Sequence, residues 1–122
     1  MTTSTYQDLV VRLPTRGRVF NATLRQLADA GRLVKIDRST AWGNPYVVDV
    51  DGDRDTVVAS YALWLEGAIG TDVMPVGRTG RTVDRRWVLD NIGLLRGKAL
   101  ACWCAPLLCH GSVLARKANG DG

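Results

Sequence analysis

The strongest structural signal in this chain is a short apolar run, Lys98 to Trp103, which lies between Gly97 and Pro106. A run of this length between two residues that interrupt regular structure is typical of a buried β-strand. Gly97 ends the helix before the strand, and Pro106 ends the strand itself. A final helix is predicted from Cys109 to Ala118. The segment therefore predicts a strand, a tight loop and a helix, as expected in an α/β domain.

The rest of the chain supplies more elements of both kinds. The predicted class is α/β, a small single domain over residues 1–122 with a mixed sheet of about four strands and helices packed on it. Residues 1–5 and 119–122 are expected to be disordered ends, and residues 67–80 a mobile, glycine-rich surface loop. The further predicted strands are Leu9–Leu13, Leu33–Ile36 and Tyr46–Val50; the further helices are Ala22–Ala30, one from an Asp53 or Asp55 cap to Glu66, and one from a Thr82 cap to Gly97.

Length and composition agree with one soluble domain. The chain has 122 residues, of which 46% are hydrophobic, enough for a core that does not depend on disulfides. No apolar run is long enough to span a bilayer, and the N-terminus lacks a signal-peptide pattern, so we expect a cytoplasmic protein and no membrane partner. Its thiols are then reduced, which favours metal or catalytic roles. The net charge of +4 favours anionic partners.

All three cysteines and the only histidine fall within residues 102–110. One interpretation is a metal site in which Cys102, Cys104, Cys109 and His110 form a candidate ligand set for zinc. The spacing is unusual, because adjacent residues such as Cys109 and His110 rarely bind one tetrahedral ion. Three ligands with an open fourth position are easier to arrange, and such a site would suit catalysis.

Two other interpretations of the same segment stay open. Cys109 at a helix N-terminus could be a reactive thiol, with His110 as an acid or base, and these two are the candidate catalytic residues. Alternatively, a cysteine can simply be a small buried apolar residue, and this applies best to Cys102. Whether the protein is an enzyme is left open by the sequence.

A second cluster surrounds Trp42-Gly43-Asn44-Pro45. Trp42 could stack on a ring, Asn44 could hydrogen-bond a small ligand, and Gly43 permits close approach of the backbone. Pro45 holds the residue before it in an extended conformation. Arg38, just before this loop, could contact an anionic group. The alternative is a rigid turn around a half-buried tryptophan.

The two clusters together resemble the domain of unknown function 4326 family of bacteria and their phages. The resemblance is carried by Ile36-Asp37-Arg38 with Trp42 to Tyr46, by the helix with Tyr61, and by the ending from Leu95 through Cys102-Trp103-Cys104 to Cys109-His110-Gly111. Asp37 stands where the family usually has glycine, and Ser112 where it usually has aspartate. The resemblance implies a small α/β fold, a paired-cluster site that includes Gly111, and a prokaryotic or phage origin. It implies no reaction.

These observations lead to one hypothesis and two alternatives. In the first, the Trp42 loop and the cysteine–histidine segment form a site for a small anionic or nucleotide-like molecule, with Arg38, Trp42, Gly43, Asn44, Pro45 and Gly111 as ligand-binding residues. A phage protein that sequesters a host signalling nucleotide would show the same features. The other alternative is a zinc-stabilised module that binds nucleic acid or protein, whose affinity for nucleic acid would fall steeply with salt. The oligomeric state is not predicted.

Overall fold

The structure is a computed structural model and describes residues 10–12, 26, 29–103 and 107–120. Three short strands form a parallel sheet in the order β1–β5–β2: β1 spans Val10–Arg12, β2 Leu33–Lys35 and β5 Ala99–Cys102. The central strand, β5, is the last of the three in sequence. Its Leu100 pairs with Val10 of β1 on one side and with Val34 of β2 on the other. Both of its neighbours come from far earlier in the chain. The predicted α/β class is confirmed.

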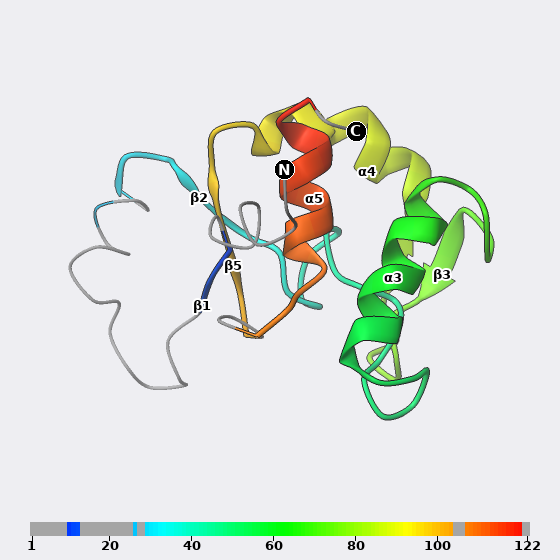
Figure 1. Cartoon of the computed structure of the whole chain (residues 1–122). Helices are drawn as coiled ribbons and strands as arrows, with labels where there is room; N and C mark the ends of the chain where they lie inside the picture. Colours follow the sequence, from blue (N-terminus) through cyan, green and yellow to red (C-terminus); the bar gives the residue numbers. More distant parts are fainter. Residues whose placement is uncertain (1–9, 13–25, 27–28, 104–106, 121–122) are drawn as a thin grey trace.

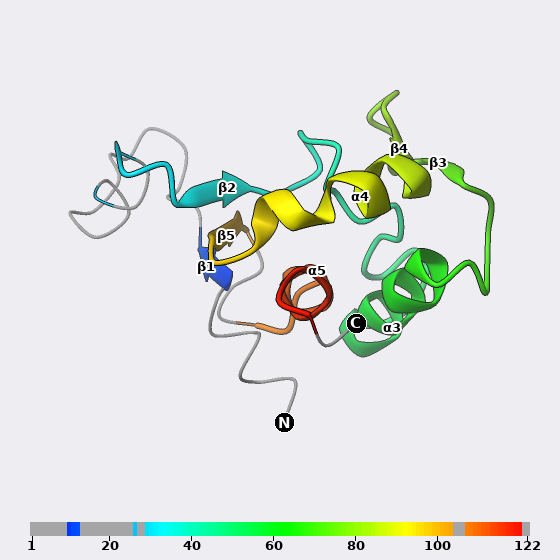
Figure 2. The ribbon, with the colours of Figure 1, turned by 90° about the horizontal axis from the view of Figure 1, so that it is seen from above.

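The helices stack on this sheet in layers. Helix α5, Gly111–Ala118, contacts β1 and β5 and lies between the sheet and helix α3, Arg54–Leu65 (Figure 1, Figure 2). Helix α4, Arg85–Asn91, continues into the 3-10 helix η1, Ile92–Leu95, which also packs on α5. Because β5 runs down to the point where α5 begins, the carboxyl end of the central strand lies close to the N-terminus of α5 (Figure 1).

Helix α3 forms where the sequence predicts it. The side chain of Asp53 caps it by accepting a hydrogen bond from the Thr56 amide at 2.8 Å. The predicted inward residues Val57, Val58, Tyr61 and Leu65 are buried, as is Trp64, whereas Ala68 beyond the helix is exposed. Apolar residues at helical spacing therefore identified the buried face of this helix.

The predicted strand Tyr46–Val50 is wrong, because this segment is a chain of turns. The Val47 carbonyl accepts hydrogen bonds from the Val50 and Asp51 amides, at 3.1 and 2.8 Å. The Asp51 carboxylate in turn accepts from the Val47 amide at 2.8 Å. Asp49 takes a left-handed conformation with φ of 70°. Local aspartate hydrogen bonds thus outweigh the strand preference of the valines.

The glycine-rich segment 67–80 contains a strand that the sequence analysis missed. Strand β3, Val73–Pro75, pairs antiparallel with β4, Thr82–Asp84, as a two-stranded sheet of its own. Thr82 therefore lies in a strand and does not cap a helix. The cap of α4 is Asp84, whose carboxylate accepts from the Arg86 amide at 2.9 Å. In place of one mixed sheet, the described residues form a three-stranded parallel sheet and a separate hairpin.

The predicted ends and the first predicted helix are only partly tested. Asn119, expected in a disordered tail, caps α5, and its side chain accepts from the Gly97 amide and donates to the Ala115 carbonyl. Residues 121–122 and 1–5 lie outside the described residues, as does most of the predicted helix Ala22–Ala30. Among the described residues, no helix combines the length and the apolar character needed to cross a membrane.

Candidate functional site

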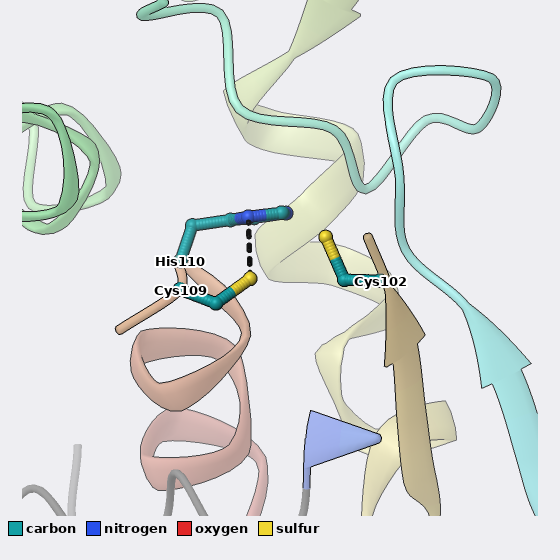
Figure 3. Close-up of side chains that lie close together, drawn as sticks. All are labelled: Cys102, Cys109 and His110. Atoms are coloured by element: carbon teal, nitrogen blue, oxygen red, sulfur yellow. Dashed lines mark hydrogen bonds between the residues drawn. The ribbon is translucent and has the colours of Figure 1, made fainter. Parts of the chain in front are cut away.

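Three residues of the cysteine–histidine segment converge at the carboxyl end of β5. Cys102 is the last residue of that strand, and Cys109 and His110 directly precede α5. Their two sulfur atoms and a ring nitrogen lie within 4.8 Å of one another, and all three residues are buried. In Figure 3 the three side chains point into one common space. The fourth residue of the predicted set, Cys104, lies outside the described residues.

The adjacency of Cys109 and His110 does not keep their side chains apart. The Cys109 Sγ lies 3.4 Å from the His110 Nδ1. His110 already has helical backbone angles, with φ of −57° and ψ of −19°. Although adjacent residues rarely bind one ion, at this helix start both side chains turn toward Cys102 (Figure 3).

The backbone around His110 fixes which ring nitrogen carries a proton. Nε2 lies 3.0 Å from the carbonyl oxygens of both Ile36 and Trp42. Carbonyl oxygens can only accept, so Nε2 carries the hydrogen and donates to them. In the neutral ring Nδ1 then keeps its lone pair, and that atom is the one that faces Cys109. This arrangement matches metal-bound histidines, which usually donate their other N–H to a carbonyl or carboxylate.

Tyr61 holds the imidazole in place from α3. Its ring meets that of His110 edge to face, with centroids 5.0 Å apart and an angle of 77°. Its hydroxyl donates to the Trp42 carbonyl at 3.5 Å, the same oxygen that accepts from His110. Burial, with a smaller contribution from Cys109, raises the pKa of Tyr61, so its hydroxyl stays protonated as a donor.

Gly111 has a packing role at the start of α5. A Cβ at this position would lie 2.7 Å from Ile36 Cδ1 and 2.8 Å from Val10 Cγ2, so only glycine lets the helix come this close to the sheet. The Gly111 amide also points at the Cys109 Sγ, at 3.4 Å. An N–H directed at sulfur favours the thiolate, the form that binds metals. Gly111, predicted to contact a ligand, does not line the cavity described below.

A cavity of about 140 Å³ opens beside the three donor atoms. Its walls come from the segment between β2 and α3, from the first turns of α3, and from both sides of the β5–α5 connection. The lining residues are Asp37, Arg38, Ser39, Asn44, Tyr46, Val48, Arg54, Val57, Val58, Cys102, Trp103, Leu108, Cys109 and His110. The two clusters singled out in the sequence therefore share one cavity.

Two arginines line the cavity from different directions. Arg38 is exposed and donates from a terminal guanidinium nitrogen to the Tyr46 carbonyl at 3.2 Å. Arg54, in the first turn of α3, donates to the Leu108 carbonyl at 3.4 Å. A guanidinium has five N–H donors, so one such bond leaves others available to a ligand. Arg38 was predicted as a ligand contact. Arg54 was missed, because no sequence pattern distinguishes it from the other arginines.

Among the described residues that line the cavity, Asp37 is the only carboxylate, and its charge is balanced by nearby hydrogen-bond donors and by Lys35. Burial alone would raise the pKa of Asp37, but hydrogen bonds from Ser39 and from the Trp103 indole, with the charge of Lys35, hold that pKa below its usual value. One oxygen accepts from the Ser39 amide and hydroxyl, and the other accepts from Trp103 Nε1 at 2.9 Å. Lys35 Nζ lies 3.9 Å away. Asp37 therefore ties the β2 end to the β5 end as an anion.

We expect Asp37→Asn to destabilise the protein at neutral pH by roughly 1–3 kcal/mol, because an amide cannot accept from all of these donors. Since folding lowers the pKa of Asp37, its contribution is present well above pH 3.8, the ordinary value, and is lost as pH falls through the folded value. Urea unfolding from pH 3 to 7 should therefore show wild type and variant converging in acid. The exposed Asp90→Asn is the control, and a constant difference at every pH would contradict the assignment.

The Trp42–Pro45 loop contacts the site through its backbone, because the Trp42 carbonyl accepts a hydrogen bond from His110. Trp42 is buried, its ring packs edge-on against Trp87 at 4.9 Å, and its contact with the site is its backbone carbonyl. The Trp42 ring, predicted to stack on a ligand, lies in the core and does not line the cavity. Pro45 is buried in the same loop and does not line the cavity.

The other two residues of that loop also serve its shape. The Asn44 amide donates to the Val57 carbonyl at 3.2 Å and accepts from the Tyr46 amide at 2.9 Å, although its side chain does line the cavity. A Cβ on Gly43 would lie 2.9 Å from the Cα of Arg38, so glycine is needed for the loop to fold back there. By holding the shape of this loop, Asn44 and Gly43 help to position Arg38 and the backbone carbonyl of Trp42.

Comparison with known protein families matches residues 20–120 to the family described as domain of unknown function (DUF4326). The chain belongs to the DUF4326 family. The matched range contains both the Trp42 loop and all three converging donors, so the cavity lies inside the DUF4326 domain. No curated protein and no solved structure matches the chain. Membership agrees with the resemblance noted in the sequence and carries no reaction with it, so function has to be argued from the site.

Proposed function

We propose that this DUF4326 domain holds a zinc ion through Cys102, Cys109 and His110, and binds a small anion at the open fourth position. The observation that carries the proposal is the convergence of two sulfur atoms and a nitrogen within 4.8 Å, in buried residues that all line one cavity. Structural zinc sites are closed by four protein ligands, whereas sites that bind or transform a ligand keep one position open. Among the described residues, which do not include Cys104, a cavity against all three donors supports the open kind.

The donor chemistry favours zinc over other common ions. Two cysteines and one imidazole suit Zn²⁺, whereas Mg²⁺ and Ca²⁺ prefer oxygen ligands. With zinc bonds of about 2.0–2.3 Å, two ligand atoms of a tetrahedron lie roughly 3.5 Å apart. The separation of Cys109 Sγ and His110 Nδ1, 3.4 Å, is of that size. The hydrogen bonds from Nε2 to Ile36 and Trp42 supply the second-layer support that zinc-bound imidazoles usually have.

Charge supports an anionic ligand. Two thiolates would neutralise the zinc ion, and the Asp37 carboxylate is already compensated by its donors and by Lys35. Arg38 and Arg54 then leave the cavity positively charged. Guanidinium groups suit phosphate and carboxylate, which accept two parallel hydrogen bonds.

Internal contacts of other arginines argue against a broad nucleic-acid surface. Arg81 donates to the Ser39 carbonyl at 2.6 Å. Arg85 donates to the Leu65 carbonyl at 2.9 Å and pairs with Asp72. Side chains committed in this way are less suited to tracking a phosphate backbone. Binding to DNA or RNA that falls steeply with salt would favour the alternative of a nucleic-acid module.

The direct test of the proposal is metal content. Protein purified without a histidine tag should carry about one zinc per chain, lost on chelation and restored by added zinc. Cobalt substitution then gives a coordination spectrum that inorganic phosphate should change if it occupies the fourth position. No zinc in freshly reduced protein would contradict the metal site. A cobalt spectrum that phosphate leaves unchanged would contradict the open position.

The arginines provide a separate prediction. Replacing Arg38 and Arg54 together by glutamine should weaken inorganic phosphate binding by roughly 10-fold or more, the loss expected for one or more charge-assisted hydrogen bonds. Zinc content should not change, because neither residue is a ligand. Titration calorimetry on zinc-loaded protein measures the effect. Arg78→Gln, an exposed arginine that does not line the cavity, is the matched control. Equal phosphate affinity in all three proteins would exclude the arginines from the site.

Retention and catalysis differ in what happens to a bound molecule. Zinc with an open position can bind an anion or activate a water molecule, so both are chemically available. Incubation with a nucleotide-like probe and analysis of the probe afterwards separates them. An unchanged probe that is tightly retained indicates sequestration, and a new product indicates an enzyme.

A further inference from the structure

Trp103 is an exposed aromatic residue on the wall of the cavity. It directly follows β5 and Cys102, and its side chain lines the cavity while 46% of the residue stays exposed to solvent. Ligand cavities are lined mainly by apolar and aromatic side chains, and an exposed tryptophan on such a wall offers its flat face to a ligand. Trp42, the tryptophan favoured from sequence, is only 6% exposed. Of these two, Trp103 is the one whose ring is accessible to a ligand.

The orientation of the Trp103 ring is fixed from its edge. Nε1 donates to Asp37 at 2.9 Å, and the other oxygen of that carboxylate accepts from Ser39. Asp37 is itself only 7% exposed, so this bond anchors the indole to a rigid group. A ring held by its nitrogen edge loses little freedom when a second ring stacks on it, which favours binding.

The cavity is too small to enclose a whole nucleotide. Its volume of about 140 Å³ is below the roughly 300–1,000 Å³ of sites that enclose drug-sized ligands. A ligand that places an anionic group near Arg38 and Arg54 must therefore leave the rest of its structure at the mouth. Trp103, which lines the cavity and is 46% exposed, is available to contact that part.

We propose that Trp103 is a stacking platform for the planar ring of a nucleoside monophosphate whose phosphate enters the cavity. The proposal rests on the proposed function, since the phosphate would occupy the position beside the zinc ligands and the two arginines. Asp37 is a positioning residue that acts through Trp103. Stacking on tryptophan tolerates different bases, because every base presents a flat π-face. Trp103 would therefore select for a planar ring and would discriminate little between one base and another.

Three probes separate the ring from the phosphate: AMP, ribose 5-phosphate and inorganic phosphate, each titrated into the zinc-loaded full chain. We expect AMP to bind at least about 10-fold more tightly than ribose 5-phosphate, as base–aromatic stacking typically provides. Trp103→Leu should abolish this difference and leave ribose 5-phosphate affinity unchanged. Trp87→Leu is the matched control, because Trp87 is 39% exposed and does not line the cavity.

The positioning role of Asp37 has its own readout. In protein labelled with 5-fluorotryptophan, the Trp103 fluorine resonance should shift on addition of AMP but not of inorganic phosphate. Asp37→Asn should move that resonance without ligand and reduce affinity for AMP more than for ribose 5-phosphate. If Asp37→Asn weakens the binding of all three probes equally, Asp37 has only a structural role, and its assignment as a positioning residue for Trp103 is wrong.

The remaining outcomes distinguish the two proposals. If AMP and ribose 5-phosphate bind equally well, and the Trp103 resonance does not respond to AMP, the platform is wrong while the anion site stands. If none of the three probes binds zinc-loaded protein, the proposed anion site fails and the platform fails with it.

Discussion

Replacing Cys109 by serine is expected to remove bound zinc and to lower the thermal unfolding midpoint by roughly 10 °C. A ligand at 100–1,000 times its Kd stabilises the folded state by about 3–4 kcal/mol, which corresponds to a shift of that size in a domain of this length. Cys109 supplies one of the three candidate donors among the described residues, and its sulfur lies 3.4 Å from the His110 Nδ1. Elemental analysis and calorimetric unfolding, each with and without chelator, measure the two effects.

The matched control is Ser112→Ala. Ser112 is as buried as Cys109, and its hydroxyl donates to the Cys109 carbonyl at 2.8 Å, so it shares the environment without being a candidate ligand. This variant should keep its zinc and its sensitivity to chelator, with a loss of about 1 kcal/mol for the hydrogen bond. If Cys109→Ser keeps full zinc occupancy, or if chelator leaves the wild-type midpoint unchanged, Cys109 is not a ligand and its thiol has another role.

The fold was predictable wherever one side-chain pattern decided it. The apolar run at 98–103 identified the central strand, and apolar residues at helical spacing identified α3 with its Asp53 cap. The hairpin was missed because β3 is short and largely exposed, and it lies among glycines that suggested a loop. Tyr46–Val50 was misassigned because two aspartates close turns around the valines, and a propensity argument does not weigh such bonds.

The candidate metal ligands of the site could be predicted from the sequence, but the other residues that line the cavity could not. Cys109 and His110 stand out because cysteine and histidine are rare in this chain and gather in one segment. Cys102, judged the most ordinary core residue, is one of the three converging donors, since the end of β5 directs it at the start of α5. Arg54 and Trp103 belong to the cavity only through tertiary packing. No short-range pattern marks them.

Trp42→Ala is expected to destabilise the protein by about 3–5 kcal/mol, the usual cost of emptying the space of a buried tryptophan. The Trp42 ring is 6% exposed and packs on Trp87, while the site uses only its backbone carbonyl, which any residue supplies. Trp42→Phe should therefore cost less stability and leave affinity for AMP near that of wild type, whereas Trp103→Leu should do the reverse. Urea unfolding and AMP titration on both variants separate core packing from ligand contact. If Trp42→Phe folds normally yet loses AMP affinity, the ring reaches the ligand after all, and the loop would have to rearrange on binding to bring it there.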